Sequence, residues 1–330
     1  MREHARMMLC AVLIGAAAAV AAAGPQARAE DPNSAPNPYH VLESWAKLPQ
    51  GRVWGMAIGV DIDRDGTSVW VFDRCGAKTC EGSNIAPIQK FDASGRLVVS
   101  FGSGLFNWPH GLFADRDGTI WVTDGKGQTV THLAPDGRVL MTLGKPNVAG
   151  DGPDTFNSPS DVVVAPNGDI FVADGHGEKT NARIVKFDKG GKFIKAWGRA
   201  GAEPGQFNVP HGLAMDSAGR LFVADRSNNR IQIFDQDGKV LAEWKQFGRP
   251  SGVYIRDDIL YVADSQSSDK VNAPFKQGIR IGSVKDGKVT AFISAPDPKI
   301  EMPEGLAADK DGNIFGGFTA NMDLKKFVKN

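Results

Sequence analysis

Three residues able to bind a metal stand at one position of a repeated motif. His110 lies in the segment Phe106–Leu112, and His211 takes the same place in its close copy, Phe207–Leu213. Glu304 takes that place in a weaker copy. Two imidazoles and one carboxylate form a known catalytic zinc set that leaves a coordination position open for water or substrate. The motif therefore predicts a metal centre. Zinc is the first expectation, iron and manganese are alternatives, and calcium suits imidazoles less well.

The metal-binding side chains alternate with serines along the chain. The residue after proline in successive copies is His110, Ser160, His211, Ser251 and Glu304. The copies lie roughly 40–50 residues apart, which is the spacing of propeller blades. In a six-fold ring, alternate blades stand about 120° apart, so the two histidines and the glutamate should point at one place on the axis. The alternative is that histidine is simply a common choice at this turn, but the alternation favours a metal centre.

A second group of polar residues follows the aspartates that end the second apolar run of the units. These residues are Arg74, Lys126, His176 and Arg226. Because strands in a blade are antiparallel, their loops lie on the same face as the proline-containing loops. We expect Arg74 to hold an anionic substrate group in bidentate fashion and His176 to transfer a proton. We interpret Lys126 and Arg226 as solvated loop residues. We expect the aspartates to bond to the blade backbone and so to have a structural role.

The elements that must position these residues are short strands. In the fourth unit, apolar runs cover residues 213–215, 221–225, 231–234 and 240–244. The third run alternates as a half-buried strand does, and Asp237-Gly238 is a hairpin turn. A lone four-stranded sheet has exposed edges and buries little, whereas radial packing of such sheets solves both problems. The fold class is therefore all-β, a six-bladed β-propeller over residues 39–330.

The ring needs a closing strand, because the last unit ends at its third strand, Leu324–Val328. The spare strand lies at the other end of the repeats. Tyr39–Trp45 resembles in sequence Phe193–Trp197, the fourth strand of another unit. We predict that this N-terminal segment completes the last blade and closes the ring.

The first 29 residues have the pattern of a cleaved signal peptide. Arg2 and Arg6 precede an Ala-rich apolar stretch, and Ala27–Ala29 is a small-x-small cleavage site. A membrane anchor is the alternative, but the cleavage site favours export. We expect a secreted or periplasmic protein in which residues 30–38 are a flexible linker. In an oxidising compartment Cys75 and Cys80 should form a disulfide, since a thiolate metal site would need a second pair.

Charge places limits on the partners. Lys and Arg together number 38, as do Asp and Glu, so no basic excess suggests nucleic acid or an anionic membrane surface. We expect a small-molecule or peptide substrate, no membrane association after signal cleavage, and a monomer.

The repeats resemble the NHL family across residues 39–330. The order of Arg74, His110, His176, His211 and Glu304 is similar to that of the peptidyl-α-hydroxyglycine α-amidating lyases. These are six-bladed propellers that cleave a hydroxyglycine-extended peptide into an amide and glyoxylate. The resemblance implies zinc at the two histidines and the glutamate, and a catalytic arginine at Arg74.

The same resemblance implies a substrate-binding surface and a second metal. Met302 corresponds to a methionine near the zinc, and we count Trp108 with Arg74 and Met302 as candidate substrate-binding residues. A structural calcium on the axis would fall near Val60 and Leu112.

The chain departs from the family at three of these positions. Glu304 replaces the third zinc histidine, and Gly305 replaces the aspartate that binds calcium. His176 replaces a tyrosine, which moves the reference pKa from about 10 to about 6.5. Two other functions fit the repeats. One is a non-enzymatic NHL scaffold that binds a peptide or protein partner on this face. The other is a lactonase-type propeller, which uses carboxylates and asparagine around calcium rather than imidazoles.

Overall fold

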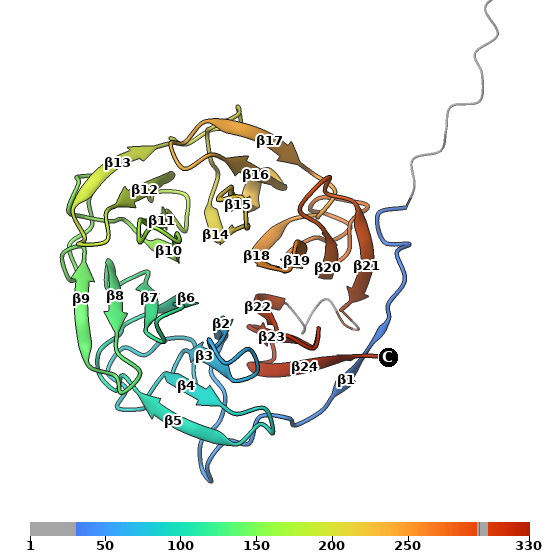
Figure 1. Ribbon diagram of the computed structural model, residues 1–330, viewed down its shortest axis with the longest axis horizontal. Coiled ribbons are helices and arrows are strands. Elements are labelled where there is room, and N and C mark those ends of the chain that lie inside the picture. Colours follow the sequence, from blue (N-terminus) through green and yellow to red (C-terminus); the bar gives the residue numbers. More distant parts are fainter. Residues whose placement is uncertain (1–30, 296, 298–302) are drawn as a thin grey trace, which may run out of the picture. The chain divides into compact units, whose positions relative to one another are not determined.

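Six four-stranded antiparallel sheets surround a common axis in the part of the chain that the structure describes (Figure 1). The structure is a computed structural model that describes residues 31–295, 297 and 303–330. The compact unit that contains the propeller spans Pro32–Asn330. The expected signal peptide and Met302 lie outside the described residues. The predicted fold class, an all-β six-bladed propeller, is confirmed.

Every blade contains four strands, numbered here in chain order. Blade one comprises β2 (Ala57–Ile62), β3 (Val69–Asp73), β4 (Ile88–Phe91) and β5 (Leu97–Phe101). Blade two comprises β6 (Pro109–Ala114), β7 (Ile120–Asp124), β8 (Thr129–Leu133) and β9 (Val139–Leu143). Blade three comprises β10 (Pro159–Val164), β11 (Ile170–Asp174), β12 (Arg183–Phe187) and β13 (Phe193–Trp197).

The second half of the ring repeats this arrangement. Blade four comprises β14 (Pro210–Met215), β15 (Leu221–Asp225), β16 (Arg230–Phe234) and β17 (Val240–Trp244). Blade five comprises β18 (Pro250–Arg256), β19 (Ile259–Asp264), β20 (Gly278–Ser283) and β21 (Val289–Ser294). Blade six comprises β22 (Pro303–Ala308), β23 (Ile314–Phe318), β24 (Asp323–Lys329) and the N-terminal β1 (Tyr39–Leu42). A short 3-10 helix, η1 (Arg226–Asn228), follows β15, and no helix among the described residues is long and apolar enough to cross a membrane.

Burial falls from the inner strands to the rim of each blade. In blade one, β3 is buried at every residue, whereas β5 alternates between partly buried and exposed positions. The core lies between neighbouring blades. For example, Trp70 and Phe72 of blade one form one cluster with Leu112 and Ile120 of blade two. Each blade therefore buries its faces against its neighbours, which fixes the direction of the innermost strands.

The predicted closure of the ring is confirmed. β1 pairs antiparallel with β24, with Tyr39 opposite Lys329 and Leu42 opposite Lys326. The strand is shorter than the matched sequence, since it ends at Leu42. Trp45 instead packs on Phe315 at a ring-centroid distance of 4.8 Å and donates its indole N–H to Ala93 O. It thereby fills the joint between blades six and one.

The segment that we predicted to be a flexible linker, residues 30–38, makes several hydrogen bonds to the propeller in its described part. Asn33 donates to Pro274 O at 2.9 Å and accepts from Arg280 at 2.8 Å. The carbonyl of Pro36 accepts from the backbone N–H of Phe292. The segment therefore lies against blade five.

Candidate metal centre

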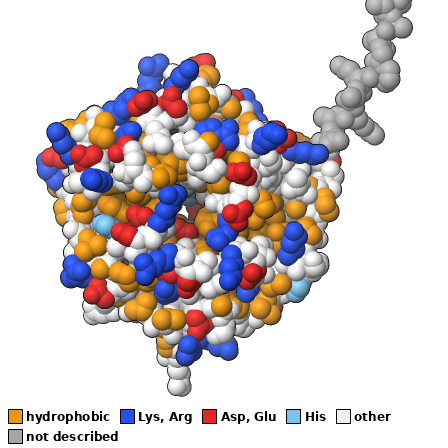
Figure 2. All heavy atoms as spheres, in the orientation of Figure 1, with side chains coloured by type: hydrophobic (Ala, Val, Ile, Leu, Met, Phe, Trp, Pro, Cys, Tyr) orange, Lys and Arg blue, Asp and Glu red, His pale blue; other side chains and the backbone are white. Residues whose placement is uncertain are grey.

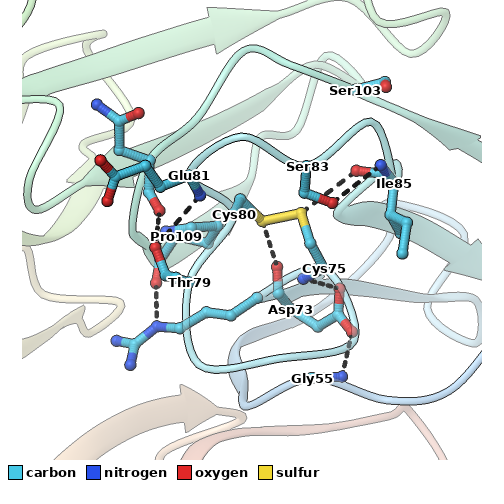
Figure 3. The surroundings of a disulfide bond; sticks show 12 residues. Gly55, Asp73, Cys75, Thr79, Cys80, Glu81, Ser83, Ile85, Ser103 and Pro109 are labelled. Atoms are coloured by element: carbon cyan, nitrogen blue, oxygen red, sulfur yellow. Dashed lines mark hydrogen bonds between the residues drawn. A yellow bond between two sulfur atoms is a disulfide. The ribbon is translucent and has the colours of Figure 1, made fainter.

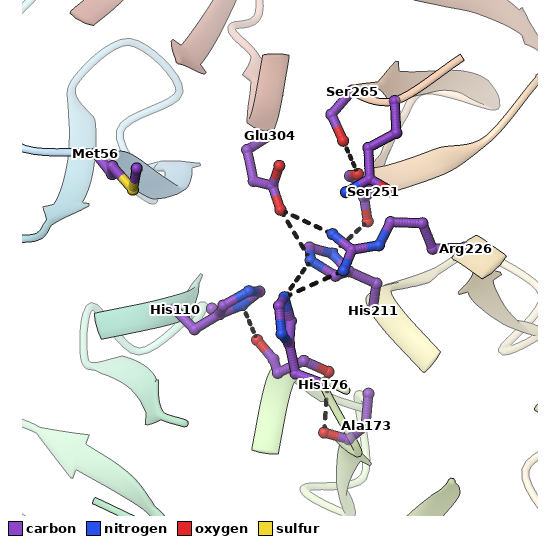
Figure 4. A network of polar contacts seen from close by, with 12 residues as sticks. Met56, His110, Ala173, His176, His211, Arg226, Ser251, Ser265 and Glu304 are labelled. Carbon is purple, nitrogen blue, oxygen red and sulfur yellow. Dashed lines mark hydrogen bonds and ion pairs between the residues drawn. The ribbon is translucent and has the colours of Figure 1, made fainter. Parts of the chain in front are cut away.

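The structure brings His110, His211 and Glu304 together on the axis. Each is the second residue of the innermost strand of its blade: β6, β14 and β22. All three side chains are buried and point toward one another from alternate blades (Figure 4). The repeated position thus delivers three donor groups to one point, as the spacing of the motif predicts.

The strand-end aspartates hold the loops that lead into these strands. Asp124 accepts the backbone N–H of Trp108 at 2.8 Å, and Asp225 accepts that of Asn208 at 2.7 Å. Asp73 binds Gly55 N–H in the same way. These contacts confirm the predicted structural role. They set the position of each proline-histidine pair relative to the second strand of its own blade.

The intervening blades orient the imidazoles. His110 Nδ1 lies 2.6 Å from Ser160 O, and His211 Nδ1 lies 3.1 Å from Ser251 O. A backbone carbonyl only accepts, so each Nδ1 carries the proton and each neutral ring leaves a lone pair on Nε2. Such a hydrogen bond on the far nitrogen is the usual support of a metal-binding histidine. The serine copies of the motif therefore contribute through their backbone.

The donor atoms form a tight group. His110 Nε2 is buried and has no hydrogen-bond partner, and His211 Nε2 lies 2.9 Å from Glu304 Oε1. His176, from the loop after β11, joins the cluster with Nε2 3.1 Å from His211 Nε2. The four ligand atoms lie within 4.8 Å of one another. Their chemistry and separations fit a transition-metal ion.

Arg226 corrects our interpretation of the second loop residues. We expected it to be solvated, but it is buried, with Nη1 3.2 Å from Glu304 Oε1 and Nη2 3.4 Å from His176 Nε2. The reason is that these two contacts hold its side chain at the axis, at the start of η1. One pattern could have found it: Arg226 follows Asp225 as Arg74 follows Asp73. Lys126 is exposed, as expected.

Arg74 and Trp108 lie beside the cluster. The guanidinium carbon of Arg74 stands 3.7 Å from the centroid of the Trp108 ring, and its Nε donates to Pro109 O at 3.1 Å. Trp108 meets His176 edge-on at a ring-centroid distance of 4.9 Å. The two candidate substrate-binding residues that the structure describes therefore form one wall of the site.

Cys75 and Cys80 form a disulfide directly after Arg74 (Figure 3). The closed loop is tied to the next blade, since Thr79 Oγ1 donates to Asn107 O at 2.7 Å and Cys80 N donates to the same oxygen. Asn107 precedes Trp108. The disulfide loop thus links the backbone of Arg74 to the segment that carries Trp108 and His110.

Comparisons with known proteins identify relatives of this arrangement. The NHL repeat family matches residues 156–187 and 207–234, in blades three and four. Peptidyl-glycine α-amidating monooxygenase A of Xenopus laevis is 33% identical over 295 residues, covering 82% of this chain and 31% of the relative. A probable peptidyl-α-hydroxyglycine α-amidating lyase of Caenorhabditis elegans is 42% identical over 135 residues, covering 40% of this chain and 38% of the relative. This chain is an NHL-repeat propeller homologous to the amidating lyases.

The share of a relative's length that this chain covers differs between the sequence relatives and the solved structures. The propeller spans about a third of the length of the curated monooxygenases that it matches. A solved gluconolactonase from Xanthomonas campestris superimposes with a TM-score of 0.61 over 94% of this chain and 99% of its own, at 16% identity. At that identity the likeness concerns the fold alone.

Charges in the centre of the propeller are arranged around neutral imidazoles. Burial lowers the pKa of His110, His176 and His211 well below the usual value, and neighbouring imidazoles or arginines lower it further. Burial also lowers the pKa of Arg74 to about 10, opposed by the charges of Glu304 and Asp124, so Arg74 is a cation at neutral pH. The site therefore combines unprotonated nitrogens with fixed positive charge.

A cavity of about 470 Å³ continues from His110, His211 and Glu304 along the axis. The space-filling view is hollowed at this centre (Figure 2). The lining includes Val60, Leu112 and Gly305, where the resemblance places calcium, and several carboxylates, among them Asp61 and Asp161. Gly305 offers no carboxylate, so oxygen ligands for a hard cation would have to come from other residues of the lining and from backbone carbonyls. Axial calcium stays a prediction.

Proposed function

We propose that this propeller is a metal-dependent lyase. Its substrate would be a peptidyl-α-hydroxyglycine or a close analogue, and its products a peptide amide and glyoxylate. The observation that carries the proposal is the convergence of His110, His211 and Glu304 beside Arg74. Homology to the amidating lyases supplies the reaction class.

His110, His211 and Glu304 would hold the metal, with zinc as the first expectation. The buried, unpartnered Nε2 of His110 and the lone pair on His211 Nε2 suit this role. Bound zinc supplies a Lewis acid that polarises a substrate oxygen and stabilises negative charge on it.

We propose that Arg74 binds the substrate carboxylate. Among the described residues it makes no ion pair, and its N–H groups face a backbone carbonyl and the Met56 sulfur. Arg226, in contrast, is paired with Glu304. A guanidinium that is desolvated, stacked and free of carboxylates binds an incoming carboxylate in a fixed orientation. Arg74 would therefore align the hydroxyglycine end of the substrate against the imidazoles.

The reaction also needs a proton carrier. Cleavage breaks the hydroxyl O–H and the C–N bond, forms the carbonyl of glyoxylate and places a proton on the departing amide nitrogen. His176 keeps an unprotonated nitrogen at neutral pH because its pKa is depressed, and this nitrogen faces the cluster. We assign His176 as the group that accepts the hydroxyl proton and returns it to the amide.

Product analysis tests the proposal. The zinc-loaded protein should convert an α-hydroxyglycine-extended peptide into equal amounts of peptide amide and glyoxylate. Arg74→Ala should lower kcat/KM by about tenfold to hundredfold, the value of a charge-assisted hydrogen bond pair. Arg138→Ala, which removes an exposed arginine, serves as the control. Zinc-loaded wild type that releases no glyoxylate would contradict the lyase proposal and favour a scaffold that binds a peptide on this face.

A further inference from the structure

His176 stands unusually close to the metal-binding atoms for a side chain that only carries protons. Its ring centroid lies 4.7 Å from that of His110 and 4.9 Å from that of His211. It projects from blade three, between the blades that carry the two histidines (Figure 4). The ligand atoms of all three imidazoles and of Glu304 lie within 4.8 Å of one another.

The hydrogen-bond pattern leaves electron pairs facing one another. Neutral His211 gives its Nδ1 proton to Ser251 O, so its Nε2 offers only a lone pair. That lone pair faces Glu304 Oε1 at 2.9 Å and His176 Nε2 at 3.1 Å. Arginine only donates, so the single lone pair of His176 Nε2 accepts from Arg226 Nη2 in the absence of a metal. Arg226 also donates to Glu304 and so satisfies part of this group. The lone pairs of His110 Nε2 and His211 Nε2 have no donor among the described residues, and they call for a further cation between the acceptors.

The separations match those of ligands that share one metal. Nitrogen and oxygen ligands lie about 2.0–2.2 Å from zinc, which places neighbouring ligands roughly 2.9–3.5 Å apart in octahedral to tetrahedral geometry. The contacts of His211 with Glu304 at 2.9 Å and with His176 at 3.1 Å fall in this range. The two contacts therefore allow His176 to join the coordination sphere without a change in its distance from His211 or in the distance between His211 and Glu304.

We propose that His176 is a fourth protein ligand of a divalent transition metal in the substrate-free protein. The set would then be three imidazoles and one carboxylate, with the third imidazole supplied by a loop rather than by an innermost strand. This inference rests on the metal centre proposed above and is independent of the lyase activity. Displacement of His176 by substrate would free its Nε2 for the proton transfer assigned to it above, so the two roles are compatible.

Counting imidazoles tests the proposal directly. X-ray absorption of the zinc-loaded protein should show three imidazoles in wild type and two in His176→Phe and His176→Gln. Phe keeps the ring bulk beside Trp108, and Gln keeps a polar partner for Arg226. Both variants should bind zinc more than about 100-fold more weakly in a chelator competition, since loss of a mere supporting group costs 10–100-fold. His40→Gln, at an exposed histidine of β1, should behave as wild type.

Each outcome decides a separate point. Two imidazoles in wild type, or folded His176 variants that bind zinc as tightly as wild type, would overturn His176 as a ligand. Wild type that binds no metal would overturn the metal centre and this inference together. Three imidazoles in a protein that releases no glyoxylate would support the inference and contradict only the lyase activity.

Discussion

Glu304 balances the charges of the centre. Its Oε1 contacts both His211 and Arg226, at 2.9 Å and 3.2 Å. A neutral histidine at this position, as the resemblance implies for the relatives, would leave Arg226 without its carboxylate. The replacement therefore lowers the net charge of the donor set by one while retaining a ligand atom.

Exchange of Glu304 tests this role. Glu304→Gln should weaken zinc binding by at least about tenfold, because a neutral amide is a poor ligand. Glu304→His should retain zinc, since the ring of blades fixes the backbone of residue 304 and directs any side chain there toward the axis. Chelator competition measures both, with exposed Glu178→Gln as the control. Equal affinity in all four proteins would exclude Glu304 from the coordination sphere.

Sequence reasoning reached the donor residues but not the contacts that tune them. The convergence of His110, His211 and Glu304 could be predicted because one repeat position carries all three. The carbonyls of Ser160 and Ser251 that orient the imidazoles could not be predicted, since every residue type has the same backbone carbonyl. Arg226 was missed although it follows Asp225 as Arg74 follows Asp73, because its burial depends on contacts with Glu304 and His176 of other blades.

At the scale of elements, the loops of blades one and two form the wall opposite Arg226. The disulfide closes a loop between residues only five apart in sequence, so its contribution to global stability is modest, about 2 kcal/mol. Its local effect is greater because Arg74 directly precedes Cys75.

Removal of the disulfide should therefore affect turnover more than folding. The double variant Cys75→Ser/Cys80→Ser should melt only a few degrees lower, while kcat/KM for the hydroxyglycine peptide falls at least about tenfold. The loss should not add to that of Arg74→Ala, because both act through one guanidinium. Additive losses, or unchanged turnover in the folded variant, would show that the loop does not position Arg74.

Ring closure by β1 is a second property of the elements. Without residues 39–46, β24 has an unpaired edge and the joint filled by Trp45 is empty. We expect the deletion variant to lose its cooperative thermal transition, measured by circular dichroism. Val41→Ala, at an exposed position of β1, should keep it. A deletion variant that melts as the full-length chain does would contradict closure by this strand.

For the whole molecule, the axial cavity links stability to pH. Burial raises the pKa of Asp61 and of Asp161 to about 7, despite hydrogen bonds from Ala114 N–H and Leu213 N–H. The folded state therefore retains protons that the unfolded chain releases near pH 4. Their stabilising contribution is complete below that pH and is lost as pH rises through about 7.

Asp161→Asn isolates this effect. In chelator-treated protein, the free energy of unfolding of wild type should fall by up to a few kcal/mol relative to that of the variant as pH rises from 5 to 9. In this state the carboxyl of Asp161 is open to cavity water. Thermal melts across this range measure the difference. The histidines, whose pKa values shift the opposite way, are common to both proteins and cancel. A pH-independent difference would show that Asp161 is ionised throughout.

The central claim is that alternate blades of this propeller build a metal centre. The most direct measurement is the metal content of the purified wild-type protein and of His110→Ala, with circular dichroism to establish that both are folded. We predict about one equivalent of tightly held transition metal in wild type and its loss in the variant. A folded wild type without metal, or a His110→Ala variant with the same metal content, would contradict the claim.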